Sequence, residues 1–288
     1  MGLRFFGGDQ RVNWSPSLVN SPALCHNRTQ VSLITLTTDF GLSDWFVGTM
    51  KGVIAGIAPK ATVIDVTHDL PAGDLRAGAF ALAASYRFFP KNTVHVVVVD
   101  PGVGSPRQAM AVRTDNYCFV GPDNGVLSLA LSGERIQAAQ ALTAEAYFLK
   151  PVSVTFHGRD IFAPVAAYLS LGTPIRRLGP ALKEFARLDW PEPRRQSGKL
   201  EGEVVYIDRF GNGITNLSGE LLRSSGATRC VIYARRRHWC PVKRFYQAVP
   251  PEAPVAVLGS TGFLEIAVNG GSAEARLGLK RGTCLTLV

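Results

Sequence analysis

An aspartate and an arginine flank a glycine- and proline-rich turn in the stretch VVVVDPGVGSPR, residues 96–107. Asp100 ends a run of four valines, and Arg107 follows after the turn. A carboxylate at the end of a strand often accepts the N–H groups of the turn that follows, as in an Asx-turn. Held beside a guanidinium, the same carboxylate could instead position a water molecule and take its proton. From these residues alone both roles stay open.

Two other stretches carry side chains of catalytic or binding types. His157, in TFHGRD, precedes a predicted helix that begins near Ile161, and its neighbour Gly158 permits the close approach of a small ligand. TTDFGLSD places Asp39 and Asp44 between a predicted strand and a helix. Either aspartate could cap that helix, and this role suits Asp44 best. An aspartate at such a tip also suits a ribose diol.

A third candidate group lies in YIDRFGNGIT, residues 206–215. If this stretch is a strand, Asp208, Phe210 and Asn212 share a face and could read an ammonium group or a purine edge. The equal alternative is a strand that runs into an Asn-Gly hairpin turn. The sequence has no GxGxxG and no GxxxxGK[ST], so a nucleotide with phosphates is a poor expectation, whereas a nucleoside stays open.

The elements that position these residues follow an α/β pattern from residue 31 onward. Apolar strand patterns alternate with helical patterns, which predicts a mostly parallel sheet with helices packed outside it. The predicted strands are 31–40, 61–70, 92–100, 108–114 and 117–125, and the predicted helices are 45–58, 75–89 and 161–172. Because open α/β sheets bind ligands at the carboxyl ends of their strands, Asp39, Asp69 and Asp100 mark the expected site.

The pattern changes after a proline-rich, charged stretch at 180–200, which suits a linker. Six short strands follow, separated by Gly, Asn and Pro turns with no helix between them, and this predicts a small β-barrel or β-sandwich. We therefore expect a disordered extension over 1–30, an α/β domain over 31–195 and a β-barrel or sandwich domain over 196–288.

Composition limits the class of protein. Hydrophobic residues make up 46% of the 288 and charged residues 18%, so the chain can form a real core. No apolar run has the length of about 20 residues that crosses a membrane, and no signal peptide is evident at the N-terminus. The net charge of +9 admits nucleic-acid binding. Much of the excess is local, however, and lies in Arg235, Arg236, Arg237, His238, Lys243 and Arg244.

The five cysteines are scattered without the spacing of a zinc site or a disulfide framework. We therefore expect no metal, and a reducing compartment such as the cytoplasm.

Seven motifs in order resemble the S-adenosyl-L-methionine (SAM) hydroxide adenosyltransferase family, which is related to the fluorinases and chlorinases. The motifs are TTDFGLSD, DVTHDLPAGDLRAGA, VHVVVVDPGVGSPR, FVGPDNGVLSL, TFHGRDIFAPVAA, DRFGNGITNL and GSTGFLEIAVNGGSA. The resemblance implies hydrolysis of SAM to adenosine and L-methionine. It also implies an N-terminal α/β domain, a C-terminal β-barrel, and a homotrimer whose active sites lie between the N domain of one subunit and the C domain of its neighbour.

The resemblance assigns roles to residues of this sequence. Asp100, Arg107 and His157 match the family's water-activating triad, and Asp39 matches the aspartate that binds the ribose hydroxyls. Asp208, Phe210 and Asn212 match residues that contact methionine or adenine. The remaining substrate-binding residues that the resemblance implies are Asp44, Tyr246 against the adenine, Ser260, Glu265 and Val268.

The implied chemistry needs no cofactor beyond the substrate, because the sulfonium of SAM already makes C5′ electrophilic. Halogenation is the rival within the fold, but halide-using relatives carry a tyrosine at the place of Asp100, and fluoride users a serine at the place of Gly158. A non-catalytic SAM or adenosine sensor is the rival from another class. It would use the same pocket, yet has no need of the whole triad. A basic nucleic-acid module is the third alternative and rests on net charge alone.

Overall fold

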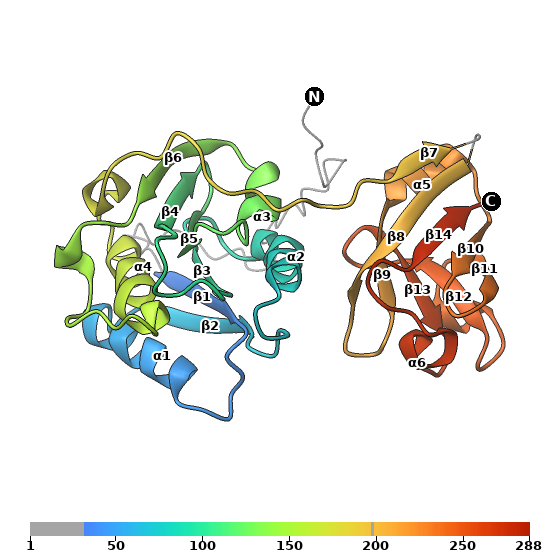
Figure 1. Ribbon diagram of the computed structural model, residues 1–288, viewed down its shortest axis with the longest axis horizontal. Helices are drawn as coiled ribbons and strands as arrows, with labels where there is room; N and C mark the ends of the chain where they lie inside the picture. Colours follow the sequence, from blue (N-terminus) through green and yellow to red (C-terminus); the bar gives the residue numbers. More distant parts are fainter. Residues whose placement is uncertain (1–31, 197–198) are drawn as a thin grey trace, which may run out of the picture. The chain divides into compact units, whose positions relative to one another are not determined.

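A computed structural model describes residues 32–196 and 199–288 and divides them into two compact units, the first ending at Leu188 and the second beginning at Asp189 (Figure 1). Each unit has its own hydrophobic core. The expected extension over residues 1–30 lies outside the described residues. Among the described residues, no helix is long and apolar enough to cross a membrane.

The first unit is built on a six-stranded sheet with the order β2-β1-β3-β5-β4-β6. Neighbouring pairs among β2, β1, β3 and β5 are parallel, whereas β4 is antiparallel to both β5 and β6. The strands are β1 (Leu33–Thr38), β2 (Thr62–Thr67), β3 (Val94–Val98), β4 (Ala109–Thr114), β5 (Cys118–Pro122) and β6 (Ile136–Ala141). The expected mostly parallel α/β domain is confirmed.

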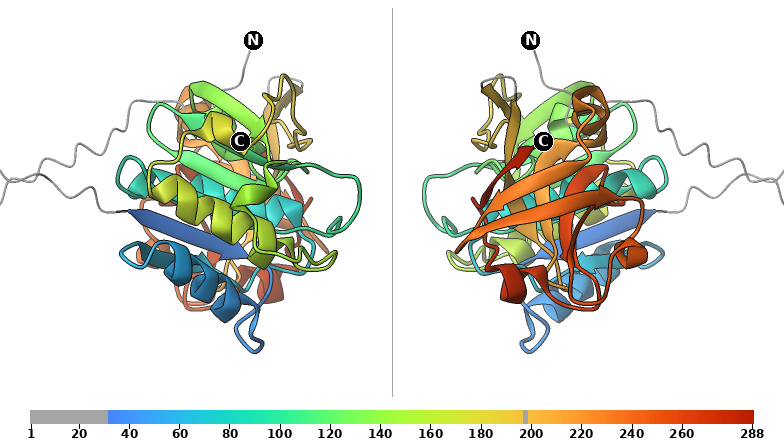
Figure 2. Two further views of the ribbon diagram at one scale, coloured as in Figure 1. Left: turned by 90° about the vertical axis from the view of Figure 1, so that its left-hand side faces the viewer. Right: turned by 90° about the vertical axis from the view of Figure 1, so that its right-hand side faces the viewer.

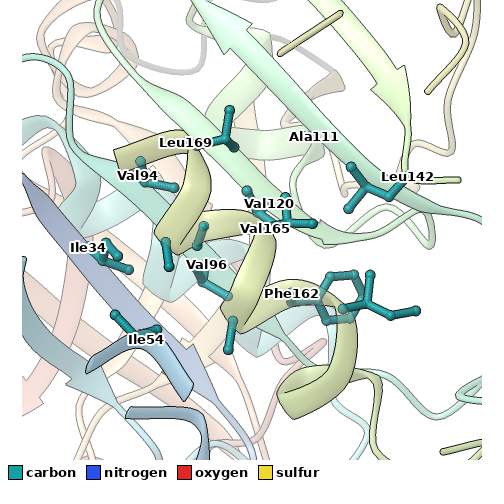
Figure 3. Packing of buried hydrophobic residues seen from close by; sticks show 14 of the residues in the cluster. Ile34, Ile54, Val94, Val96, Ala111, Val120, Leu142, Phe162, Val165 and Leu169 are labelled. Atoms are coloured by element: carbon teal, nitrogen blue, oxygen red, sulfur yellow. The ribbon is translucent and has the colours of Figure 1, made fainter. Parts of the chain in front are cut away.

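Helices cover both faces of this sheet. They are α1 (Phe46–Ile57), α2 (Leu75–Ser85), α3 (Ser128–Ser132) and α4 (Ala163–Ser170). Because successive strand residues point to opposite faces, Ile34 of β1 and Val96 of β3 pack with α1 and α4 (Figure 3). His95 of β3 faces the other way and contacts the ring of Tyr86, which follows α2 directly.

Two predicted helix boundaries differ from the structure. The helix expected over 75–89 is α-helical only to Ser85 and continues as a 3₁₀ turn, Tyr86–Phe88. The helix expected from Ile161 begins earlier, because a π-helical turn, Gly158–Phe162, leads directly into α4. Further 3₁₀ turns span Glu145–Tyr147, Ile175–Leu178 and Tyr246–Ala248.

The second unit is a closed β-barrel, as expected. Seven strands form the ring β14-β10-β11-β12-β13-β9-β8, which closes because β14 also pairs with β8, and the short β7 pairs with the first residues of β8. The strands of this unit are seen in the right-hand view of Figure 2. The strands are β7 (Arg194–Gln196), β8 (Lys199–Ile207), β9 (Gly213–Ser218), β10 (Arg229–Tyr233), β11 (Arg237–Lys243), β12 (Pro254–Leu258), β13 (Phe263–Val268) and β14 (Cys284–Leu287).

The expectation that no helix interrupts these strands is wrong. Two short helices, α5 (Gly219–Ser225) and α6 (Ala273–Leu277), lie between them. Each begins at a serine whose side chain accepts a backbone N–H, and each ends at a glycine in the left-handed conformation. These caps satisfy the terminal backbone groups of helices that are too short to show a helical period.

Candidate active site

The expected site lies at one edge of the first sheet. Strands β2, β1 and β3 are parallel neighbours, so their carboxyl ends meet at this edge. Asp39 follows β1 directly, and Asp69 and Asp100 follow β2 and β3 after one intervening residue. Strand β4 runs in the opposite direction, so its first residues return to the same edge.

A tight turn brings Arg107 back to Asp100. The N–H of Val103 donates to the Asp100 carbonyl at 3.2 Å. Gly104 has a φ of +77°, and a Cβ there would collide with the Val154 carbonyl. This position therefore requires glycine for both its conformation and its close packing. The turn returns the chain to the start of β4, where Arg107 stands.

Asp100, Arg107 and His157, which the resemblance implies as a triad, form one hydrogen-bonded group. Both carboxylate oxygens of Asp100 accept from Arg107: Nε donates to Oδ1 at 2.8 Å, and Nη2 donates to Oδ2. Nη2 of Arg107 also contacts Nδ1 of His157 at 2.9 Å. The Asp100 side chain is 4% exposed and that of Arg107 11%, so the ion pair is shielded from water. A bidentate pair of this kind fixes orientation as well as charge.

The contact with Arg107 determines which ring nitrogen of His157 carries the proton. A guanidinium has donors and no acceptor, so Nδ1 must accept and the neutral ring carries its proton on Nε2. Burial, and after it the charge of Arg107, lower the pKa of His157 from its ordinary value, while Asp100 and Asp160 act in the opposite direction. The neutral ring is therefore favoured, with Nε2–H as a donor.

Several supporting residues were not anticipated. The side chain of Asn124 donates to the Val99 carbonyl at 2.9 Å and so fixes the backbone beside Asp100. The guanidinium of Arg107 lies 5.5 Å from the centre of the Phe162 ring. Asp160 is fully buried and accepts from the Ser153 N–H at 2.8 Å, which holds the loop before His157. Asn124 and Asp160 stand within the motifs GPDNG and HGRD, but spacing alone did not reveal their partners.

Asp39 is half-buried and accepts the N–H of Gly73 at 2.7 Å. A buried network holds the residue before it. Oγ1 of Thr38 lies 2.8 Å from Nδ1 of His68, whose Nε2 lies 3.1 Å from Asp65. The carbonyl of His68 also accepts the N–H of Gly41. His68, in the motif DVTHDL, therefore fixes the loop that presents Asp39.

Two details of the sequence interpretation need correction. Asp44 is exposed and does not cap α1, because the N-cap residue is Trp45 and no side chain caps that helix end. The Cβ position of Gly158 faces the rings of Phe156 and Phe40 at 3.2–3.3 Å, not open space. The missing side chain at position 158 thus accommodates aromatic packing and does not leave room for a ligand.

The Asp208 stretch is a hairpin loop between β8 and β9, so the strand interpretation is wrong and the hairpin alternative holds. Oδ1 of Asp208 accepts the backbone N–H groups of Phe210 and Asn212, and Oδ2 accepts the side-chain amide of Asn212 at 3.0 Å. Phe210 is 76% exposed, whereas Asn212 is buried. The three residues are adjacent but do not share a face.

Tyr246 and Glu265 form a second polar group within the barrel unit. The Tyr246 hydroxyl donates to Glu265 at 2.6 Å. Burial raises the pKa of Glu265, and the charge of Asp208 raises it further, against the hydrogen bond from Tyr246. The pKa of Tyr246 is raised by burial and by the same hydrogen bond. The carboxylate of Asp208 is thus close enough to raise the pKa of both Tyr246 and Glu265.

Ser260 and Val268 take separate positions in the barrel unit. Ser260 is exposed in the loop between β12 and β13, and Val268 is buried at the end of β13 with its carbonyl accepting the Gly271 N–H. No cluster of three or more metal-ligating side chains occurs in the part of the chain that the structure describes.

Comparison with known proteins gives matches along most of the chain. Residues 34–179 match the SAM hydroxide adenosyltransferase N-terminal domain, and residues 202–286 match the C-terminal domain. The chain is 42% identical over 254 residues to an (R)-S-adenosyl-L-methionine hydrolase of Salinispora arenicola, with 86% of this chain and 95% of that protein covered. It is 43% identical to the protein of the same name from Thermus thermophilus, with 87% and 97% covered.

A more distant sequence and a solved structure also match most of the chain. A fluorinase of Actinoplanes is 27% identical, with 88% of this chain and 97% of that protein covered. A crystal structure of an uncharacterized conserved protein from Thermotoga maritima superposes with a TM-score of 0.84 at 36% identity, covering 88% of this chain and 99% of that one.

Proposed function

The chain belongs to the SAM hydroxide adenosyltransferase family, and we propose that it hydrolyses SAM to adenosine and L-methionine. The observation that carries the mechanism is the Asp100–Arg107–His157 group at the carboxyl edge of the first sheet. It combines a shielded carboxylate, a fixed cation and a neutral imidazole donor. This is a set of groups that can orient a water molecule and accept its proton.

The reaction forms one bond and breaks one bond at C5′. Water oxygen attacks C5′ in line, and the C5′–S bond breaks with its electron pair moving to sulfur. The sulfonium thereby becomes the neutral thioether of methionine, so the leaving group requires no proton. One proton is released from the attacking water. Holding the water in line removes much of the entropic barrier, which in favourable cases amounts to about 7–11 kcal/mol.

We assign the proton acceptor to Asp100 and a donor role to His157. Each Asp100 oxygen accepts one N–H from Arg107 and keeps a further lone pair for water. His157 uses Nδ1 to accept from Arg107, so its Nε2–H can only donate, to the water or to the hydroxide that forms. Arg107 joins the two and keeps them in place.

Substrate contacts follow the resemblance where the geometry permits. We propose that Asp39 binds the ribose diol, that Tyr246 lies against the adenine, and that Asp208 and Glu265 face the methionine ammonium, since carboxylates suit a cation. The other proposed contacts are Asp44, Phe210 with its exposed ring, Asn212, Ser260 and the backbone of Val268.

We further propose a cytoplasmic homotrimer in which a neighbouring subunit supplies the barrel residues of each site, with no partner beyond SAM, water and the products. The sulfonium supplies the electrophile, so we propose that neither cofactor nor metal takes part. Because the relatives' names specify an (R)-configured substrate, we propose the (R)-sulfonium diastereomer as the preferred one.

The decisive experiment is turnover of SAM in H₂¹⁸O with mass spectrometry of the adenosine. The wild type should place ¹⁸O in the 5′-hydroxyl, and Asp100→Asn should abolish this. Asp115→Asn, at an exposed aspartate of the same unit, is the matched control. Separate assays with (R)- and (S)-SAM test the diastereomer. Binding of SAM without release of adenosine would refute hydrolysis and leave the sensor, and halide-dependent release would indicate the halogenase.

A further inference from the structure

A pocket of about 230 Å³ in the first unit reaches the triad from the side of Arg107 and His157. Both residues line it and Asp100 does not. Its rim includes Gln108 and Thr143, which are exposed. Its inner part is formed by buried side chains: Ala109, Ala141, Leu142 and Ile161. Leu142 belongs to the core shown in Figure 3, so the pocket extends from the surface of the unit to its core.

Two of the residues that line the pocket, Arg107 and His157, carry hydrogen-bond donors. Arg107 has five N–H groups, and its contacts with Asp100, His157 and the Gln108 carbonyl use four of them. Within the described residues, one N–H on Nη1 and the Nε2–H of His157 have no partner. An ordered water needs about two to four polar partners and roughly 10–15 Å³. The pocket meets both conditions.

The sheet order places this pocket away from the expected substrate contacts. Asp39 follows β1, Asp100 follows β3, and the pocket lies at the start of β4 and the end of β6. Along the order β1-β3-β5-β4-β6, Asp100 therefore stands between the ribose-binding aspartate and the pocket. A substrate bound over Asp39 and Asp100 would therefore lie on one side of the triad, and the pocket lies on the other side.

We propose that this pocket is a water vestibule that supplies the attacking water to the triad while SAM occupies the opposite side. The proposal rests on the proposed hydrolysis. Each turnover consumes one water, and the pocket offers that water a position beside the triad, away from the expected substrate contact at Asp39. The side chains of Ala109 and Ala141, which line the pocket, are small, and the free N–H groups of Arg107 and His157 can hold a water beside the triad.

Two variants test the vestibule from different positions. Thr143→Phe covers the mouth at an exposed residue, and Ala141→Val narrows the buried wall. We expect each to lower kcat by about tenfold with KM for SAM within about twofold of wild type, since water supply and not substrate binding is affected. Ala146→Phe, an exposed neighbour outside the pocket, should have wild-type kinetics.

A crystal structure of the wild type with adenosine bound gives a readout independent of rate. It should show ordered water in the pocket in contact with His157 or Arg107, and the Thr143→Phe structure should lack it. Wild-type kcat in both Thr143→Phe and Ala141→Val, or a dry pocket in the wild type, overturns the vestibule. An inactive wild-type protein would instead refute the proposed hydrolysis itself.

Discussion

Replacement of His157 by glutamine separates the two roles that a triad histidine can have. In the structure, Nδ1 accepts from Arg107 and Nε2–H remains as a donor. A glutamine side chain can reproduce both, because its carbonyl oxygen accepts and its amide donates, but it cannot take up a proton. We therefore expect kcat of His157→Gln to stay within about tenfold of wild type. If His157 were instead the general base, its replacement by glutamine would lower kcat by about 10²–10⁴-fold.

Leucine at the same position provides the comparison. It leaves an N–H of the shielded Arg107 guanidinium without an acceptor, a loss of about 1–3 kcal/mol. If that loss falls on the transition state, kcat decreases by about 5- to 150-fold, because each 1.36 kcal/mol corresponds to a tenfold change in rate. We expect His157→Leu to be clearly slower than His157→Gln, and Asp100→Asn to be slower than both.

The pH profile gives a second test of the same assignment. Burial and Arg107 lower the pKa of His157, so the ring stays neutral at neutral pH and gains a proton only as the pH falls through that lowered value. Protonation places a hydrogen on Nδ1 and breaks the contact with Arg107. Wild-type kcat/KM should therefore fall on the acid side below about 6.5, and His157→Gln should lose that component. A glutamine variant as slow as the leucine variant would refute the donor role.

Four further predictions follow: two concern stability, one concerns the loop that bears Asp39, and one concerns metals. Asp100→Leu should lower the free energy of unfolding in urea by about 3–5 kcal/mol, because it leaves the shielded Arg107 unpaired; an effect below about 1 kcal/mol contradicts this. Burial lowers the pKa of His95 to about 3, so the unfolded chain takes up a proton that the folded chain refuses, and stability should fall by about 1.4 kcal/mol per pH unit below about 6.5. His95→Phe should lose this dependence of stability on pH, and an unchanged dependence would exclude protonation of His95 as its cause. His68→Leu should raise KM for SAM several-fold more than it lowers kcat, since it acts through the loop bearing Asp39; His68→Asn should restore part of the loss. Dialysis against EDTA should leave kcat unchanged, and recovery on adding a divalent metal would contradict a metal-free mechanism.

The first sheet and its site could be predicted because their signals are local. Four valines in a row indicate a strand buried on both faces, and Asp100 directly after them must lie at its carboxyl end. Arg107 follows a turn of only a few residues that contains two glycines, so it cannot move far from Asp100. His157 lies 50 residues beyond Arg107, and only the resemblance placed it in this group.

Two of the errors share a physical cause: short-range hydrogen bonds compete with the pattern of side chains. In YIDRFGNGIT the alternation favours a strand, but Asp208 accepts two backbone N–H groups within four residues and stabilises a loop instead. Ser218 and Gly226 are helix caps around α5, yet a seven-residue helix has too few turns to show a period. Strand β11 was concealed by the charges of RRRHWCPVK, although its Cys240 is buried opposite Cys230.

The protonation state of the site could not be derived from residue types, because it depends on one contact. An aspartate and a histidine on a motif allow either group to act as base, and both remain possible as long as the partner of Nδ1 is unknown. Because Nδ1 faces Arg107 and a guanidinium never accepts a hydrogen bond, Nε2 carries the proton of the neutral ring, and this supports the proposed assignment of Asp100 as the proton acceptor. Lysine could not replace it, because a single ammonium cannot span both oxygens of Asp100 in parallel and reach His157 in the same plane. In the proposed mechanism Arg107 thus makes Asp100 and His157 chemically different: Asp100 is left to accept from water and His157 to donate to it.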